Sequence, residues 1–352
     1  MLTNNSRILG STALMTLALT GMAVAGPTVT GYVTGSYNKN LNNPVTRASS
    51  PLNYYQQTRE ATFESDAAHI TLAGGDSLKA TYGIDIDAGT NSASNGGSIT
   101  GKNWGIEVQQ AFVAVPFGST AFGLKGGKFY TTEGIEVLNS AANPTISRGL
   151  LFGQVEPVAH TGAVVTGTFA KFDFAVGGVN GWDSTLSSAT DGIPMVLGKV
   201  GFNLGAPLVG ALTAYYGAYQ AHDNLLSIDL TAANHTLALV DLNVQVNYLV
   251  KAKIDGTNDL TYFGAGLQPL FHFGAAQVGL RYEFLTSKTE GDAKSHSANS
   301  ISVSPGYKLT PATLVRAEFR MDIASDSVFT TDKGANMSKT EPTVSAELNY
   351  TF

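Results

Sequence analysis

The last ten residues, TVSAELNYTF at 343–352, alternate without exception between polar and apolar side chains. The apolar positions are Val344, Ala346, Leu348, Tyr350 and Phe352. A period of two predicts a β-strand with one dry face and one wet face. A strand whose dry face ends on an aromatic residue is typical of the closing strand of an outer-membrane β-barrel, because that face meets lipid and its aromatic residues lie at the interface.

The same alternation recurs in five further segments, at 79–88, 171–176, 241–251, 277–284 and 315–322. The last of these carries Arg316, Glu318, Arg320 and Asp322 on one face. Lipid excludes such a face, since an Arg at mid-depth costs about 2–4 kcal/mol, and a dry core would require every charge to be paired. We therefore predict a water-filled lumen whose wall includes Lys128, Arg281, Glu283, Arg316, Glu318 and Arg320. The pattern alone leaves open a one-sided, solvated sheet of a soluble protein.

The connections between the alternating segments are of two kinds. Short ones lie near 74–76, 116–119, 168–171, 204–207, 271–274 and 309–312, and long polar ones lie near 39–57, 89–103, 131–159, 181–193, 287–297 and 323–341. Short periplasmic turns opposite long external loops are typical of all-β, antiparallel up-and-down transmembrane barrels. The count predicts sixteen strands if a weak strand lies at 225–236, with fourteen as the alternative. A barrel of about sixteen strands encloses an aqueous channel.

The first 25 residues predict a secretory signal peptide. Arg7 is its positive end, residues 8–22 are apolar, and Ala23-Val24-Ala25 is a small-x-small cleavage pattern before Gly26. An uncleaved membrane helix is the alternative, although the apolar stretch is short for one. We therefore expect export, cleavage of residues 1–25 and a barrel of residues 26–352 in the cell outer membrane.

Composition narrows the classes of function. Charged residues make up only 14% of the chain, and cysteine is absent, which excludes disulfides and thiolate metal sites. Without Arg7 the chain carries 20 basic and 27 acidic residues, a net charge of -7, which argues against nucleic acid as a partner. The six histidines are scattered and no G-x-S-x-G motif is present, so we predict neither a metal site nor an enzyme, and no cofactor.

The connection at 131–159 differs from the other loops because it mixes charged and apolar residues. The run GKFYTTEGIEVLNSAANPTISRGLLFGQVEPVAHTG at 127–162 resembles that of the OmpL-like β-barrel porins of Gram-negative outer membranes. The matching positions are Gly127, Lys128, Phe129, Gly134, Glu136, Asn143, Ser147, Arg148, Leu151, Phe152, Pro157, His160, Thr161 and Gly162. Gly149 stands where that family is expected to have Ser. The resemblance implies a porin that passes small hydrophilic solutes and ions by diffusion.

By analogy with general porins, residues 131–159 are expected to fold inward as a constriction loop. Leu138, Ile146, Leu150, Leu151 and Phe152 need a dry surface, and the interior wall of the barrel is the nearest one. Two roles remain open for the charged residues of this loop, which are Glu133, Glu136, Arg148 and Glu156. Arg148 faces the glutamates across the passage and filters ions, or it pairs with Glu136 only to hold the loop in place.

The acidic excess of the loop predicts a mild preference for cations. The expected partners are outer-membrane lipid, the barrel-assembly machinery through the strand that ends at Phe352 and, by analogy with sixteen-stranded porins, two further copies in a homotrimer. The alternative function is that of a non-conducting structural or adhesive barrel that acts through its external loops. Those loops are mostly Asn, Ser, Thr, Asp and Gly, which makes an adhesive surface the weaker interpretation.

Overall fold

The computed structural model describes residues 26–43, 62–77, 79–90, 105–118, 120–182, 195–204, 208–218, 224–253, 256–331 and 336–352. The expected signal peptide at 1–25 lies outside these residues. Among the described residues, no helix has both the length and the apolar character that crossing a membrane requires.

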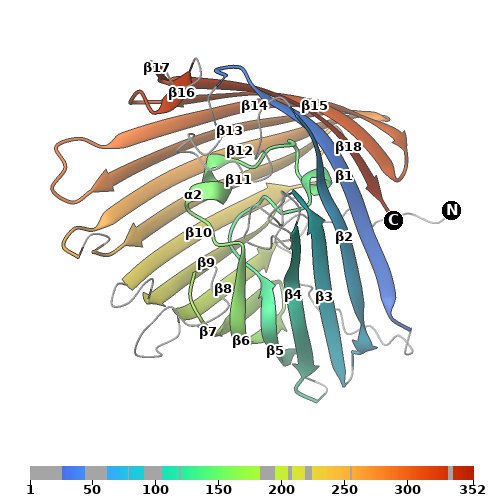
Figure 1. The fold of residues 1–352 in the computed structure, drawn as a ribbon. Coiled ribbons are helices and arrows are strands. Elements are labelled where there is room, and N and C mark those ends of the chain that lie inside the picture. Colours follow the sequence, from blue (N-terminus) through green and yellow to red (C-terminus); the bar gives the residue numbers. More distant parts are fainter. Residues whose placement is uncertain are drawn as a thin grey trace.

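Sixteen strands close into one antiparallel barrel, which Figure 1 shows from the side. Its strands are β1 (Thr28–Asn40), β2 (Thr62–Asp76), β3 (Ala80–Gly89), β4 (Gly105–Pro116), β5 (Phe122–Tyr130), β6 (Ala159–Phe169), β7 (Phe172–Val179), β8 (Met195–Asn203), β9 (Val209–Ala218), β10 (Asn224–Asn234), β11 (Val240–Lys251), β12 (Leu260–Phe273), β13 (Ala276–Thr289), β14 (His296–Thr310), β15 (Thr313–Ala324) and β18 (Thr340–Thr351). The predicted strand number and the weak strand at 225–236, now β10, are both confirmed.

Each strand pairs with its neighbour in sequence, except that β15 pairs with β18. A small hairpin of β16 (Phe329–Thr331) and β17 (Asn336–Ser338) lies in the connection between those two strands. The barrel closes where β1 pairs with β18, in a register that sets Tyr32 opposite Thr351. Gly31 and Phe352 exchange backbone hydrogen bonds of 2.9 Å, so the final aromatic residue belongs to the seam.

The alternation predicted from the C-terminal stretch separates the two faces of the sheet. In β18, Leu348 and Tyr350 are half exposed on the outer face, whereas Glu347 and Asn349 are 5% and 1% exposed on the inner face. In β15 the same parity sends Arg316, Glu318, Arg320 and Asp322 inward and leaves Phe319 exposed outside. The inner polar side chains are buried because another segment fills part of the lumen.

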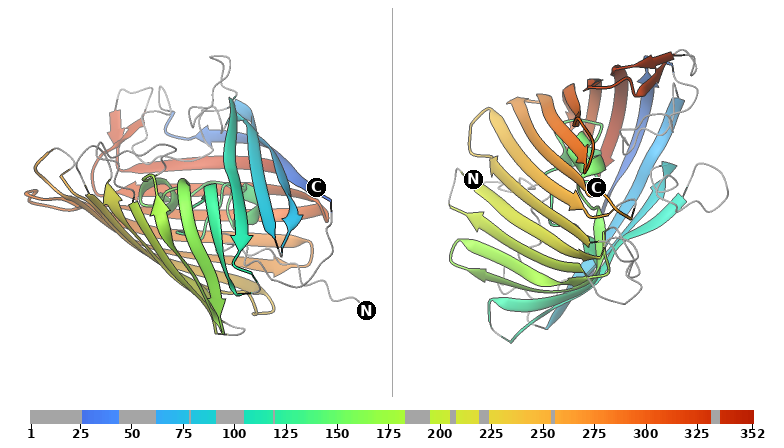
Figure 2. Two further views of the ribbon diagram at one scale, coloured as in Figure 1. Left: turned by 90° about the horizontal axis from the view of Figure 1, so that it is seen from below. Right: turned by 90° about the vertical axis from the view of Figure 1, so that its left-hand side faces the viewer.

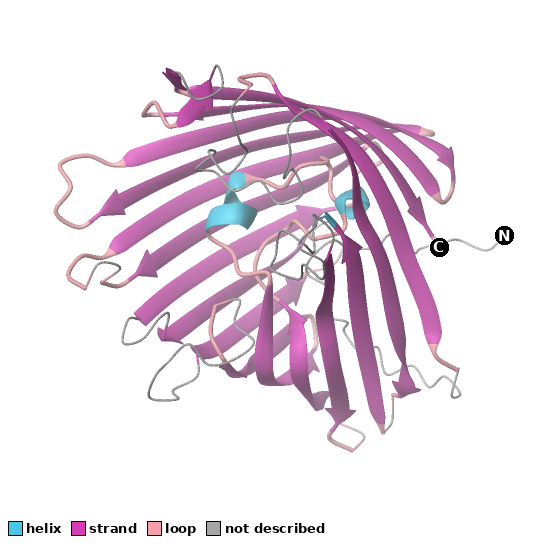
Figure 3. Ribbon diagram, in the orientation of Figure 1, coloured by secondary structure: helices cyan, strands magenta, loops and turns pink. Residues whose placement is uncertain are grey.

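That segment is the connection between β5 and β6, residues 131–158, which we name the inner loop. It contains a 3₁₀ turn, η3 (Ser140–Ala142), and one helical turn, α2 (Leu150–Gln154). Figures 1, 2 and 3 show both short helices inside the ring of strands. The short turns predicted near 168–171, 271–274 and 309–312 all join hairpins at one end of the barrel, and the inner loop starts from the other end.

Candidate functional site

Buried charged residues of β13, β15 and β18 form one side of the lumen, against the inner loop. We name this set the charged wall, and its members are Arg281, Glu283, Arg316, Glu318, Arg320 and Glu347. All six side chains are at most 5% exposed. Five of them were predicted from the alternation as lumen-wall residues, and the structure places those five on the inner face; Glu347 is the addition.

Glu318 is the acceptor that holds the middle of the loop. Its Oε2 accepts hydrogen bonds from the backbone N–H groups of Ile146 at 2.5 Å and Ser147 at 2.8 Å, and its Oε1 accepts from Ser147 Oγ. Two strands further round, on β13, the Glu283 carboxylate accepts from the backbone N–H of Leu150, at the start of α2. Hydrogen bonds to an ionised carboxylate are roughly twice as strong as neutral ones. The two carboxylates therefore fix residues 146–150 in position.

The arginines of the charged wall supply the matching donors. Arg281 forms an ion pair of 2.9 Å with Glu136 of the loop, and it also donates to Thr145 Oγ1 at 2.7 Å. Arg316 pairs with Glu347 at 2.6 Å and donates to the carbonyl oxygen of Asn143 at 2.8 Å. Arg320 pairs with Asp322 at 2.9 Å and donates to the carbonyl oxygen of Arg148. A planar guanidinium group has five N–H donors, so each arginine can bind several acceptor oxygens of the barrel and the loop at once.

Arg148 does not have either of the partners expected from the sequence. Its guanidinium is fully buried and donates to the carbonyl oxygens of Val137 at 2.5 Å, Leu138, and Ile146 at 2.8 Å. In the described part of the chain no ion pair joins it to Glu133, Glu136 or Glu156, and Glu136 pairs with Arg281 instead. Burial lowers the pKa of Arg148 to about 10, although Glu136 and Glu347 act in the opposite direction. Arg148 thus ties together the two arms of the loop through their backbones.

The two ends of the inner loop meet at a buried acidic cluster beside β10 and β11. Gln245 donates to the carboxylates of both Glu156 and Asp229, and the backbone N–H of Gly134 donates to Asp229 at 3.2 Å. Glu133 is 1% exposed in the same region. Burial, followed by the charges of Asp229, Glu136 and Glu133, raises the pKa of Glu156 well above the ordinary carboxyl value. The neutral form of Glu156 is therefore favoured where these acids meet.

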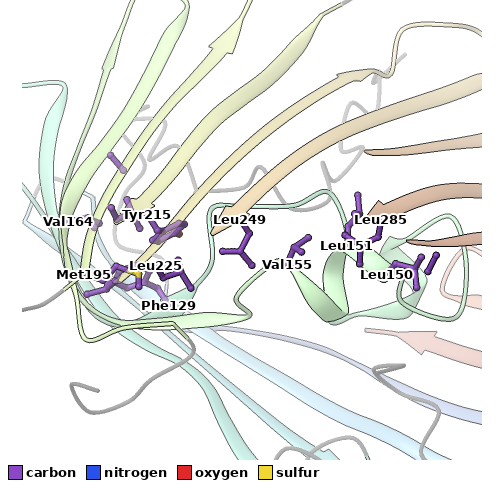
Figure 4. Packing of buried hydrophobic residues seen from close by; sticks show 14 residues of the cluster. Phe129, Leu150, Leu151, Val155, Val164, Met195, Tyr215, Leu225, Leu249 and Leu285 are labelled. Atoms are coloured by element: carbon purple, nitrogen blue, oxygen red, sulfur yellow. The ribbon is translucent and has the colours of Figure 1, made fainter. Parts of the chain in front are cut away.

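Apolar side chains also hold the loop, both beside the charged wall at Leu285 of β13 and on the opposite side of the lumen, as Figure 4 shows. Leu150 and Leu151 lie against Leu285, and Val155 lies beside Leu249. We name as the apolar wall the inward residues of β6 to β11 that continue this cluster, which are Val164, Ala175, Val179, Met195, Leu197, Tyr215, Leu225 and Leu249. The prediction that the apolar residues of the loop pack inside the barrel is confirmed: Leu138, Ile146, Leu150, Leu151 and Phe152 are at most 9% exposed.

Two inward glycines, Gly264 of β12 and Gly279 of β13, allow the inner loop to approach the barrel closely. The sequence analysis predicted neither. A Cβ at Gly279 would lie 1.7 Å from the carbonyl oxygen of Pro144, and a Cβ at Gly264 would lie 2.3 Å from Leu151 Cδ2. Glycine within a strand marks a close approach by another segment, and that signal is present in the sequence at both positions without indicating which segment approaches.

Lys128 is the one predicted lumen-wall residue that the structure places elsewhere. It shares a face of β5 with Phe122 and Leu124, which are exposed on the outside, and it alternates with the buried Phe129. Its ammonium donates to the carbonyl oxygen of Val108 at 2.7 Å and lies 3.4 Å from Glu107. The prediction of a lumenal Lys128 was therefore wrong, because the charge suggested the lumen where the parity of the strand gives the outer face.

Acidic residues line the lumen on β2 and β3, away from the charged wall. Glu64, Asp66, Asp85 and Asp87 are buried inward residues, and His69 lies 3.5 Å from Asp87. Between these strands and the inner loop lies a cavity of about 470 Å³, which Asp85 and Glu133 help to line. The alternating Asp85 and Asp87 were visible in the segment at 79–88, but nothing in the sequence indicated that the inner loop leaves this side less filled.

Comparison with known proteins agrees with this architecture. The sequence profile of the family described as "Putative beta-barrel porin-2, OmpL-like" matches residues 26–352. No curated protein matches the chain in sequence. Among solved structures, the anion-selective porin from Comamonas acidovorans is similar over 93% of this chain and 99% of its own, with a TM-score of 0.63 and 12% identity.

Two further structures have the same fold. The trimer form of OmpT from Vibrio cholerae is similar over 94% of this chain and 100% of its own, with a TM-score of 0.63 and 9% identity. The outer membrane channel DcaP of Acinetobacter baumannii is similar over 94% and 99%, with a TM-score of 0.60 and 11% identity. At these identities the likeness concerns the fold, and the family match covers the whole barrel. The chain belongs to the OmpL-like β-barrel porin family and is an outer-membrane porin.

Proposed function

We propose that the inner loop is the constriction of this porin and that small hydrophilic solutes diffuse past it along the β1–β5 side of the lumen. The observation that carries the proposal is the set of strands to which the loop is attached: β13, β15 and β18 through the charged wall, and β9 to β11 through Tyr215, Asp229 and Gln245. Glu318 and Glu283 fix its backbone N–H groups, and Arg281 fixes Glu136. A loop held in this way narrows the lumen without closing the β1–β5 side, and the solute gradient alone drives transport.

We infer a mild preference for cations, on different residues from those that the sequence suggested. Arg148 is enclosed by carbonyl groups and Glu136 is neutralised by Arg281, so neither gives the passage a free charge. The β2–β3 side contributes the buried, inward carboxyl groups of Glu64, Asp66, Asp85 and Asp87, and the negative charge of this side favours cations over anions in the lumen. The similar porin from Comamonas acidovorans is described as anion-selective, so ion preference is a property that this fold allows to vary.

The remaining assignments concern the surroundings of the barrel. The exposed apolar outer face fits outer-membrane lipid, and the strand that ends at Phe352 supplies the C-terminal signal expected by the barrel-assembly machinery. A homotrimer is supported by the trimer form of the similar OmpT structure, and residues 1–25 are proposed as the cleaved signal peptide that sends the chain there. Transport of this kind requires no catalytic step and no cofactor.

The experiment is a planar-bilayer recording on the refolded mature protein. Discrete current steps that grow with KCl concentration are expected, and a KCl gradient should give a reversal potential on the cation-selective side. The Asp85→Asn/Asp87→Asn double variant should reduce that selectivity, whereas the Asp292→Asn variant in an external loop should leave it unchanged. A membrane-inserted, heat-modifiable barrel that passes no current would refute the channel, and a chloride-selective reversal potential would refute the cation preference.

A further inference from the structure

The cavity beside the inner loop has the size and lining of a ligand site. Its volume is about 470 Å³, within the range of about 300–1,000 Å³ that is usual for small-molecule pockets. Apolar atoms form most of its lining surface, with Phe129, Leu138, Phe152, Val164 and Leu197 among the residues of the barrel and of the loop that contribute. A passage for freely hydrated ions has no need of so apolar a chamber, whereas a solute with an apolar body would leave water to occupy it.

One cation points into this chamber. The Lys125 ammonium lies 3.8 Å from the centre of the Phe112 ring and 5.1 Å from the centre of the Phe129 ring. Within the described residues the Lys125 ammonium contacts these two rings and forms no ion pair with a carboxylate. Aromatic faces stabilise an ammonium only in part, and a partly buried charge favours an opposite charge beside it.

Neighbouring acids restrict the charge of the ligand. Asp85 also lines the cavity; its carboxylate accepts a hydrogen bond of 2.6 Å from Gln110 and lies 4.0 Å from His69. Glu133 and Glu136 line the loop side. One negative charge at Lys125 is favoured, whereas a second carboxylate at the far end of a ligand would be repelled by Asp85 and Glu133; Glu136 is paired with Arg281.

We propose that this cavity binds small monocarboxylates with an aromatic or aliphatic body, whose carboxylate pairs with Lys125 Nζ. The proposal rests on the proposed diffusion function in that it names a class of solute for it. The apolar body occupies the space between Phe129 and the inner loop, and the site is a stopping point on the passage. The inward carboxyl groups of β2 and β3 still govern the proposed preference for simple cations.

Saturation-transfer NMR on the refolded protein in detergent tests the site without any current. Benzoate should bind more tightly than benzamide, which has the same shape without the charge, and more tightly than phthalate, which adds a second carboxylate. Lys125→Met should weaken benzoate binding by about tenfold or more, the effect of losing one charge-assisted hydrogen bond. Lys125→Arg should retain most of the binding, and Lys128→Met, the same change on the outer face of the same strand, should leave it unchanged.

Equal binding of benzoate to the wild type and to Lys125→Met, or equal binding of benzoate and benzamide, would overturn the proposal. The channel is tested separately by conductance in KCl alone. A protein that binds benzoate and passes no current would retain the site and lose the diffusion function. A protein that conducts KCl and fails to bind benzoate would retain the diffusion function and lose the site.

Discussion

On one side of the lumen the charged wall holds the inner loop through ion pairs and hydrogen bonds. On the other side the apolar wall contacts the loop mainly with hydrocarbon, and the Tyr215 hydroxyl, which is hydrogen-bonded to Thr132, is its polar contact. Hydrogen bonds to Glu318 and Glu283 are directional and fix residues 146–150 atom by atom. The contacts of Val155 with the apolar wall are not directional, and they exclude water without selecting one position. The charged wall therefore decides where the loop lies, and the apolar wall stabilises it there.

Loss of one charged anchor should have the largest effect. Glu318→Ala leaves two backbone N–H groups of the loop without their acceptor and removes a charge from the network around Arg281. Removing one partner of a buried charged pair costs about 3–5 kcal/mol. We expect the inner loop to become sensitive to protease while the barrel still inserts, as measured by limited proteolysis in vesicles. Glu318→Gln, which keeps an acceptor oxygen, should show a smaller increase in cleavage. If Glu318→Ala were as resistant to protease as the wild type, Glu318 would not anchor the loop.

Truncation on the apolar side should be milder and should not move the loop. Val155 is fully buried and lies beside Leu249 of the apolar wall, so Val155→Ala loses about 1–3 kcal/mol of local stability through the cavity left behind. Urea unfolding of the refolded barrel measures this loss. Proteolysis of the loop should change less than in Glu318→Ala. If the apolar variant released the loop more readily than the charged one, the distinction between the two walls would be reversed.

A single methyl group tests how closely the loop approaches the charged wall. Gly279→Ala places a Cβ against the carbonyl oxygen of Pro144, so the loop must shift, at a cost of about 1–3 kcal/mol. The matched control is Gly198→Ala, because a Cβ at Gly198 meets no atom within 4 Å. We expect altered single-channel conductance in the first variant and wild-type conductance in the second. Identical conductance in both would mean that the loop does not lie against β13.

The smallest expected effect is a pH dependence at the acidic cluster. Because the pKa of Glu156 is raised in the docked loop, the docked state holds a proton that a released loop would lose near the ordinary carboxyl value. Docking is therefore strongest below that value and weakens as the pH rises toward the raised pKa of Glu156. Glu156→Gln should abolish this trend in loop proteolysis between pH 5 and pH 9. If the pH dependence of loop proteolysis persisted in Glu156→Gln, a titratable group other than Glu156 would be its cause.

The sequence predicted the barrel well because one physical requirement acts on every strand. A sheet between lipid and water must alternate, so segments such as 315–322 and 343–352 reveal both strand and face. The inward position of the loop was predictable from the apolar residues Ile146, Leu150 and Leu151, which have no place at an exposed tip.

The partners of the charged residues were beyond reach of the sequence. Arg148 bonds to backbone carbonyl groups, and Glu318 to backbone N–H groups, which every residue carries and no side-chain pattern shows. Arg281 lies 145 positions from Glu136, a separation at which pairing depends on the closed barrel. The prediction for Lys128 was wrong for a different reason: the charge of the side chain was given more weight than the alternation of inward and outward residues along β5, which places Lys128 on the outer face.

The proposal that the inner loop narrows the pore is tested most directly by single-channel conductance in planar bilayers. The comparison is between the wild type and a variant that lacks the middle of the loop. The variant replaces residues 138–149 by two glycines. Arg316 and Arg320 of the charged wall keep their ion pairs with Glu347 and Asp322, which lie on the strands of the barrel. We predict a conductance severalfold above that of the wild type, in a barrel that remains heat-modifiable. A correctly inserted variant whose conductance equals that of the wild type would show that residues 138–149 do not narrow the pore.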